Sequence, residues 1–349
     1  MEKSVGVSMR RICMAVSFLV VLFVIVSLVS PAAYAQDKPL SLTFSNFLFA
    51  QAQNSVLAEK WCREVEARTN NKVKITIYHG GTLTPGPKIY DGVVNGLSDI
   101  GMSVFAYTKG KFPLTEVIDL PIGHTSGYIS TKLINEYFKK FRPKELDDVK
   151  VMYITAHGPG VMMTKRPVYK LEDLKGMKIR GTGLSGKVLA ALGAEPVVTT
   201  MGEAYNALAK GQVEGVLSPI EGLEQWKFQE VVDYVTESTA AAYTSAFFVV
   251  MNKARWNSLP TDVQKVIEEI NREWTEKQGR QWDEIDNVGR EYGVKRGIKI
   301  IKLSKEEDER WAKQVRPLLD DYVRETKQKG LPGDEALEFC INYLKANRR

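Results

Sequence analysis

The sequence predicts an α/β protein of two domains. Its 349 residues exceed the ~250–300 residues at which a single hydrophobic core stops growing. Strand and helix patterns alternate along two stretches, 40–104 and 149–217, as in sheets covered by helices. A long helical pattern over 261–292 follows. At 1.5 Å per residue it would extend ~45 Å, farther than one small domain, so it should bridge both.

The first stretch has the order of a βαβαβ unit. Leu40 to Phe44 alternates with period two and predicts a strand. A helix is expected over 53–69, a strand over 73–78, and a helix over 86–97 that ends at an Asn-Gly signal. A third strand is expected over 98–104. This order favours a parallel sheet.

The second stretch repeats the alternation. The breaker cluster 157–160 follows a strand over 149–155 and marks a candidate crossover. Residues 243–251 form a strong β segment that could return the chain, and 304–349 are helical, with a break at 330–333. The remaining elements are strands over 161–164, 178–180, 196–199 and 215–217, and helices over 184–192 and 202–210.

The first 35 residues have the features of an export signal. Lys3, Arg10 and Arg11 precede an uncharged stretch over 12–29, and an Ala-x-Ala sequence ends at Ala35. A signal peptide cleaved after Ala35 is expected, with an uncleaved anchor as the alternative. The mature protein would be periplasmic and not inserted in the membrane.

Composition excludes several classes of protein. The chain is 44% hydrophobic and 26% charged, which is typical of soluble proteins, and its one long apolar run excludes a polytopic membrane protein. The net charge of +6 is spread out, so no nucleic-acid partner is expected. Three cysteines are too few for a disulfide scaffold. Pairing of Cys62 with Cys340 stays open.

A glycine-rich turn follows the strand over 178–180. Gly181 to Gly186 matches the G-x-G-x-x-G pattern, and Gly181 to Lys187 matches most of a Walker A loop. Val188 stands where the Walker motif needs Ser or Thr, and the next strand lacks the acid of a dinucleotide site. No cofactor is therefore expected.

Arg180 ends the strand just before this turn. Free N–H groups at a helix N-terminus and a planar guanidinium would together hold an anion such as a carboxylate. From the residues alone, a surface arginine paired with a nearby acid is an equally good interpretation.

Several segments resemble, in order and spacing, the DctP-type substrate-binding proteins of TRAP transporters. Leu171 to Arg180 is similar to their D-L-K-G-x-K-I-R motif, and Asp119 to Pro121 to their D-L-P motif. Glu203 to Gly215 is similar to E-x-Y-x-A-L-x-x-G-x-V-D-G, with Glu214 for Asp. The resemblance covers about 40–293 and includes two shorter segments, Ile77 to Leu83 and Gly96 to Gly101.

The resemblance implies a two-domain periplasmic-binding-protein-like (type II) fold with crossover hinge strands and a long helix spanning both domains. Domain I would comprise 36–156 and about 244–285, and domain II 157–243 and about 286–349. The implied function is capture of an organic acid in the interdomain cleft, by a monomer, for delivery to TRAP permease subunits. Residues 158–164 lack the second basic residue common in the family. A monocarboxylate, whether keto, hydroxy or aromatic, is therefore expected.

Candidate ligand-binding residues come from the resemblance and from position. The resemblance makes Arg180 the carboxylate-binding arginine, and Ser218 stands where many members have a ligand-binding asparagine. Glu221 could meet an amino group or be solvated. The other candidates lie after strands or near crossovers: Asn46, Phe47, Ser103, Phe105, Thr182, Tyr243 and His157. For the aromatic residues and the histidine, a structural role is the alternative, and Trp226 is expected to pack in the core.

The case for an enzyme is weak. The sequence has no G-x-S-x-G or H-E-x-x-H motif, and its histidines and cysteines lack metal-ligand spacing. No catalytic residue and no metal site are expected. The alternatives are a ligand-presenting subunit for a sensor receptor and an exported enzyme acting on a small carboxylic acid.

Overall fold

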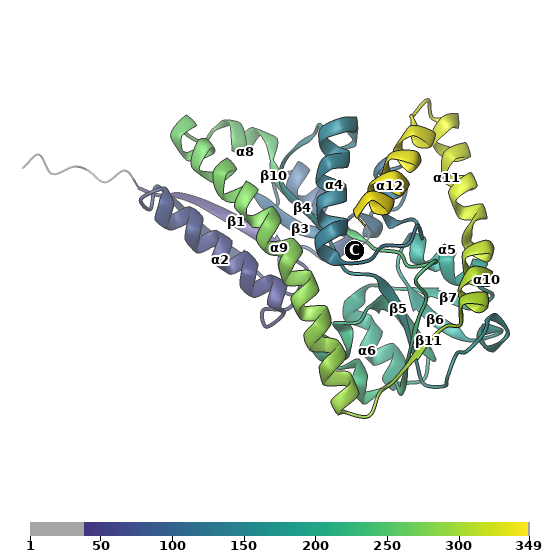
Figure 1. The fold of residues 1–349 in the computed structure, drawn as a ribbon. Coiled ribbons are helices and arrows are strands. Elements are labelled where there is room, and N and C mark those ends of the chain that lie inside the picture. Colours follow the sequence, from purple (N-terminus) through teal and green to yellow (C-terminus); the bar gives the residue numbers. More distant parts are fainter. Residues whose placement is uncertain (1–37, 348–349) are drawn as a thin grey trace, which may run out of the picture. The chain divides into compact units, whose positions relative to one another are not determined.

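The computed structural model of the protein describes residues 38–347. The expected signal peptide lies outside the described residues. The chain from Leu40 onwards forms one unit, which contains two β-sheets (Figure 1). Within 38–347 no helix is both long and apolar enough to span a membrane.

The first sheet has five strands in the order β2-β1-β3-β10-β4. Strands β1 (Leu40–Asn46), β2 (Val73–Tyr78) and β3 (Ile100–Val104) are parallel. Strand β10 (Ala246–Asn252) is antiparallel to its neighbours β3 and β4 (Val149–Ala156). The three strands of 40–104 are therefore parallel, as predicted. The whole sheet is mixed, because β10 enters from the second sheet and runs in the reverse direction.

The second sheet has six strands in the order β11-β9-β5-β8-β6-β7. Its bounds are β5 (Gly160–Thr164), β6 (Lys178–Gly181), β7 (Glu195–Val198), β8 (Gly215–Pro219), β9 (Tyr234–Glu237) and β11 (Lys299–Lys302). Strands β6, β7 and β8 are parallel, whereas β5 is antiparallel to β8 and β9. Strands β9 and β11 were not predicted.

The helices largely follow the predicted periodicity. The expected helix over 86–97 is shorter, because a 3-10 turn containing Pro87 precedes it and Gly96 ends it with a φ of 76°. Helix α4 was not predicted; its N-cap is Ser126, whose hydroxyl accepts from the N–H of Ile129. The α-helices are α2 (Gln53–Arg68), α3 (Ile89–Val94), α4 (Gly127–Phe141), α5 (Leu184–Ala191), α6 (Met201–Ala209), α7 (Gly222–Gln225), α8 (Lys253–Asn257), α9 (Thr261–Lys295), α10 (Lys305–Val315), α11 (Pro317–Gln328) and α12 (Gly333–Asn347).

The first sheet has apolar layers on both faces. Alternation along β10 places Phe247 in the core shared with α2 and α9, and Phe248 in the core shared with α3, α4 and α12. Helix α12 packs on α4, so this last helix lies with the first sheet, although the sequence assigned all of 286–349 to domain II. Cys62 and Cys340 are both free and buried, one in each layer.

Two crossovers connect the sheets. The chain passes from β4 to β5 through 157–159 and returns from β9 to β10 through 238–245. The two segments are hydrogen-bonded to each other, from His157 N to Ser245 O at 3.3 Å and from Gly160 N to Tyr243 O at 2.8 Å. The breaker cluster at 157–160 is therefore a crossover, as predicted.

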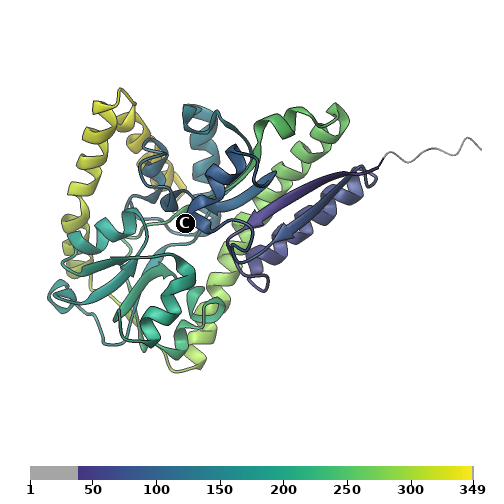
Figure 2. The same cartoon turned by 180° about the vertical axis from the view of Figure 1, so that it is seen from behind.

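Helix α9 packs against elements of both sheets (Figure 2). It contacts β4 of the first sheet and helices α2 and α4, which cover that sheet. It also contacts α7, which follows β8 of the second sheet. Near its end it approaches the backbone closely at Gly289, where a Cβ atom would lie 2.6 Å from Cα of Glu221 and 2.9 Å from the carbonyl oxygen of Ile220. The long helix therefore fixes the position of the segment that follows β8.

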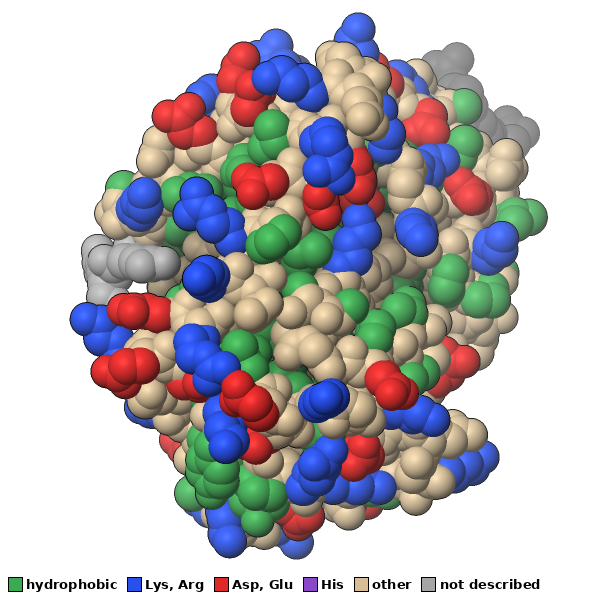
Figure 3. Space-filling view, turned by 90° about the vertical axis from the view of Figure 1, so that its right-hand side faces the viewer, with side chains coloured by type: hydrophobic (Ala, Val, Ile, Leu, Met, Phe, Trp, Pro, Cys, Tyr) green, Lys and Arg blue, Asp and Glu red, His purple; other side chains and the backbone are tan. Residues whose placement is uncertain are grey.

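One face shows how surface charge is distributed. In Figure 3, Lys and Arg side chains alternate with Asp and Glu side chains across the molecule. This face therefore carries no continuous basic patch of the kind that binds nucleic acid.

We predict that Gly289→Ala destabilises the protein. Because the added methyl group would meet backbone atoms, α9 must shift, and such overpacking costs about 1–3 kcal/mol. The thermal denaturation midpoint should fall by roughly 2–4 °C for each kcal/mol. Gly202→Ala is the matched control: it lies in α6 with no atom within 4 Å of the new Cβ, and alanine favours a helix. Equal midpoints for the two variants would contradict the close packing of α9.

Candidate functional site

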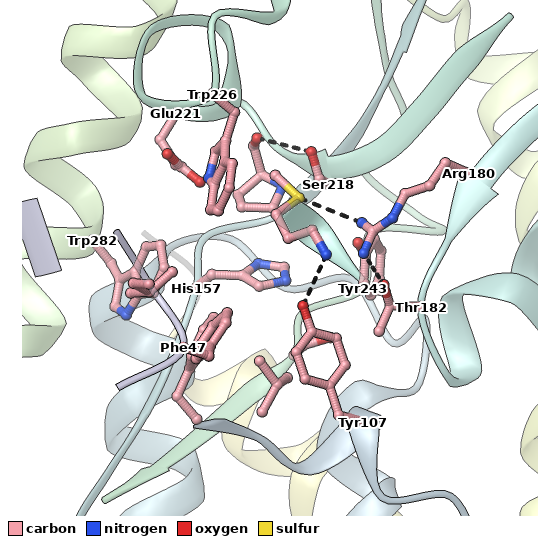
Figure 4. Close-up of a pocket in the computed structure, with 16 residues that line it drawn as sticks. Phe47, Tyr107, His157, Arg180, Thr182, Ser218, Glu221, Trp226, Tyr243 and Trp282 are labelled. Atoms are coloured by element: carbon pink, nitrogen blue, oxygen red, sulfur yellow. Dashed lines mark hydrogen bonds between the residues drawn. The ribbon is translucent and has the colours of Figure 1, made fainter. Parts of the chain in front are cut away.

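A cavity lies where the carboxyl ends of strands from both sheets meet. The space in it that no atom fills is about 490 Å³, and this volume includes the open solvent at its entrance. Residues at or just beyond the ends of β1, β3, β6 and β8 line it, together with the crossovers and α9 (Figure 4). Strand ends and the loops after them are the usual location of ligand sites in α/β folds.

Arg180 is the charged group at the centre of this site. Its side chain comes from β6 and the residue is only 3% exposed. Its Nε and Nη2 atoms donate to the carbonyl oxygen of Thr199 at 3.2 and 2.7 Å, and Nη2 also donates to the Thr182 hydroxyl. Nη1 reaches only the sulfur of Met201, at 3.5 Å, which is a weak acceptor.

The guanidinium has no counter-ion in the described chain. Every acceptor it uses is neutral, and within 38–347 no carboxylate forms a salt bridge with it. Burial lowers the pKa of Arg180, but an arginine side chain stays protonated in proteins. The sequence allowed Arg180 to be a surface arginine paired with an acid. In the structure Arg180 is instead buried, forms no salt bridge within 38–347, and lines a cavity.

Aromatic rings form one wall of the cavity. Phe47 stacks on Phe247 with ring centroids 6.2 Å apart and contacts Tyr107 edge-on at 5.5 Å. Phe247 in turn lies 5.0 Å from Trp282 of α9. Figure 4 shows the rings of Phe47, Tyr107 and Trp282 facing the same space as Arg180, and Phe247 also lines the cavity. We call Phe47, Tyr107, Phe247 and Trp282 the aromatic wall.

His157 lies between the aromatic wall and the second sheet. Burial lowers its pKa to about 4, and the charge of Arg180 acts in the same direction. Nδ1 contacts the carbonyl oxygen of Gly158, so this nitrogen carries the proton and Nε2 is an acceptor. Among the described residues that line the cavity, Arg180 is therefore the one cation near neutral pH.

Seven of the ten predicted residues line the cavity. They are Arg180, Ser218, Phe47, Thr182, Tyr243, Glu221 and His157. Tyr243 donates to the carbonyl oxygen of Leu217 at 3.0 Å. Ser218 makes only a long 3.4 Å hydrogen bond, to Pro219 O. Its hydroxyl can therefore donate to a ligand as well.

The other three predicted residues lie away from the cavity, which corrects the expectation of direct contact. Asn46 is buried and caps the turn after β1, accepting from the N–H of Leu48 at 3.0 Å. Ser103 donates to the carbonyl oxygen of Gly86 at 2.8 Å. Phe105 packs on Phe248, 5.1 Å away, in the opposite core layer. Alternation along the strands explains this, because neighbouring residues face opposite sides.

Several lining residues were not predicted. Trp282 and Phe247 come from elements more than a hundred residues after Phe47. Trp226 packs against the core, as expected, and also lines the cavity. No alternation of apolar and polar residues within 246–252 could have identified Phe247, because β10 is apolar and buried from Ala246 to Met251.

The chain belongs to a family described as bacterial extracellular solute-binding protein, family 7, or DctP, whose model matches residues 49–326. This family comprises periplasmic solute-binding proteins of TRAP transporters, which are binders and not enzymes.

Three solved TRAP solute-binding proteins are similar over 88–89% of this chain. One from Desulfovibrio salexigens is 36% identical, with a TM-score of 0.79 and 97% of its chain covered. One from a marine metagenome, specific for aromatic acids and bound to metahydroxyphenylacetate, is 29% identical, with a TM-score of 0.84 over its whole length. One from Rhodoferax ferrireducens with copurified benzoate is 27% identical, with a TM-score of 0.83 and 98% covered. The fold is therefore the two-domain, type II-like fold of these proteins, as predicted.

We predict that Arg180→Met leaves the thermal midpoint of the ligand-free protein unchanged or raises it. The buried guanidinium is desolvated without a counter-ion, so an apolar side chain of similar length removes an unfavourable charge. Arg310→Met is the control. Arg310 contacts Glu307 at 2.7 Å, a carboxylate whose side chain is only 10% exposed, so its loss should lower the midpoint. A larger loss for Arg180→Met would contradict the assignment of an unpaired charge.

Proposed function

We propose that this protein captures an aromatic monocarboxylate in the cavity between its two sheets and delivers it to a TRAP permease. The observation that carries the proposal is the buried, unpaired Arg180 opposite the aromatic wall. After removal of a signal peptide ending at Ala35, the protein would act in the periplasm.

The carboxylate part of the proposal follows from charge and geometry. A buried guanidinium needs an anion, and a carboxylate matches its planar fork with two parallel hydrogen bonds. The Nη1 atom of Arg180, the phenol of Tyr107 and the hydroxyl of Ser218 border the same cavity. Tyr107 accepts from the N–H of Met201 at 2.9 Å, which leaves its own proton for a ligand oxygen.

The charges on the lining favour one carboxylate over two. His157 is neutral because burial lowers its pKa to about 4. Glu221 also lines the cavity, and a carboxyl group offers no positive charge to a second anion. A dicarboxylate would therefore leave one of its charges buried without a cation, which is costly.

The aromatic part of the proposal rests on the wall. Rings prefer stacked or edge-on neighbours at 4.5–7 Å, each pair adding about 0.5–1.5 kcal/mol beyond burial. The proteins from the marine metagenome and from Rhodoferax ferrireducens, which hold metahydroxyphenylacetate and benzoate, support the same ligand class for this chain.

Capture would be coupled to closure. Arg180 belongs to the second sheet, Phe247 to the first, and Phe47 follows a strand of the first. A ligand that contacts residues from both sheets therefore stabilises the closed conformation, in which both sets of residues reach it. A ligand shifts such an equilibrium by its differential affinity for the two states. The two hydrogen-bonded crossovers and α9 are the connections about which this hinge motion would occur.

We predict that aromatic monocarboxylates raise the thermal midpoint of the protein after unfolding and refolding to remove bound ligand. At a hundred times Kd the gain is about 2.7 kcal/mol, or roughly 5 °C or more. The panel includes benzoates, phenylacetates, mandelates, aliphatic 2-oxo acids and dicarboxylates. A shift confined to dicarboxylates or to aliphatic acids would contradict the proposal.

We also predict that Arg180→Met weakens binding of the best aromatic acid at least thirtyfold. Truncating one side of a desolvated charge pair costs about 2–5 kcal/mol, and calorimetric titration would measure the loss. Arg166→Met is the control, since Arg166 is half exposed and paired with Glu214 at 3.2 Å on the same sheet. Unchanged affinity for Arg180→Met would overturn the carboxylate assignment.

A further inference from the structure

Glu221 is the carboxylic acid among the described residues that line the cavity. It lies just beyond β8 and is only 5% exposed. Figure 4 shows its carboxyl group beside Trp226, on the side of the cavity away from Arg180. No ion pair within 38–347 joins the two residues, so the cavity has a basic end and an acidic end.

The backbone around Glu221 is held firmly. Its N–H donates to Oδ1 of Asp286 at 3.1 Å, and Gly289 allows α9 to lie against its Cα atom. Because helix and loop are in direct backbone contact here, the side chain projects from a fixed point into the cavity.

The carboxyl group of Glu221 has one neutral partner, the side chain of Trp226, which acts on it as a hydrogen-bond donor. Within 38–347 it forms no salt bridge, and a carboxyl group with two oxygens has further acceptor sites. Burial, followed by the charges of Asp286 and Glu224, raises its pKa well above the usual value, whereas the Trp226 side chain acts in the opposite direction. A buried carboxyl group with an unused acceptor site favours a ligand that supplies a further donor.

We propose that Glu221 accepts a hydrogen bond from a hydroxyl or amino group on the part of the ligand farthest from its carboxylate. This inference rests on the proposed function and makes it more specific: the ligands would be hydroxy- or amino-substituted aromatic acids. A carboxyl group has an acceptor oxygen whether or not it is protonated. The neighbouring acids disfavour a further anionic substituent at this end.

Selectivity should then depend on the donor and not on the size of the substituent. A site built around a buried acceptor discriminates against an analogue that leaves this acceptor unpaired. A fluorine is close in size to a hydroxyl group but has no proton to donate. Hydroxybenzoates should therefore bind at least tenfold tighter than the fluorobenzoates with the same substitution pattern.

Calorimetric titration of the refolded protein tests this inference with benzoate and with the 3- and 4-substituted hydroxy-, amino- and fluorobenzoates. In Glu221→Leu the preference for the best hydroxybenzoate over its fluoro analogue should fall to about onefold. Glu221→Gln, which retains an acceptor oxygen, should retain a preference. Glu224→Gln is the matched control, because Glu224 lies three residues on in α7 and does not line the cavity.

Three results would overturn the inference. Equal affinity of the wild-type protein for hydroxy- and fluorobenzoates would overturn it and leave the proposed function intact, and this comparison does not depend on the folding of any variant. A preference that persists in Glu221→Leu, with a normal thermal midpoint, would also overturn it alone. Failure of every aromatic acid to bind, while an aliphatic acid does, would overturn the proposed function as well.

Discussion

The positive charge of Arg180 is the constraint on which the site depends. A guanidinium that is 3% exposed has lost most of its hydration, and its acceptors in the chain are a backbone carbonyl, a hydroxyl and a thioether. Charged groups in such surroundings are normally paired. The missing partner is therefore expected from outside the chain, at the cavity that Arg180 lines.

The fold supplies the rest of the site around this charge. Four strand ends deliver lining residues from two sheets. The two crossovers are hydrogen-bonded to each other, and α9 packs on both halves. Both halves therefore contribute to one site while their connections stay few, which is the arrangement of proteins that close around a ligand.

Much of this arrangement was predictable because it is local. Period-two and helical patterns located most strands and the long helix, and the resemblance of Leu171 to Arg180 to a family motif identified Arg180. The sequence could not show that Arg180 lacks a counter-ion, since pairing depends on distant residues. It could not place Phe247 and Trp282 beside Phe47 for the same reason. The direction of β10 and the packing of α12 likewise depend on topology, which a local pattern does not contain.

The most direct test of the central claim is a crystal structure of the protein with a bound aromatic acid. Our account predicts the ligand carboxylate within hydrogen-bonding distance of the Arg180 guanidinium and the ring against Phe47 and Phe247. A carboxylate held elsewhere, with Arg180 paired to a side chain of the protein, would contradict it.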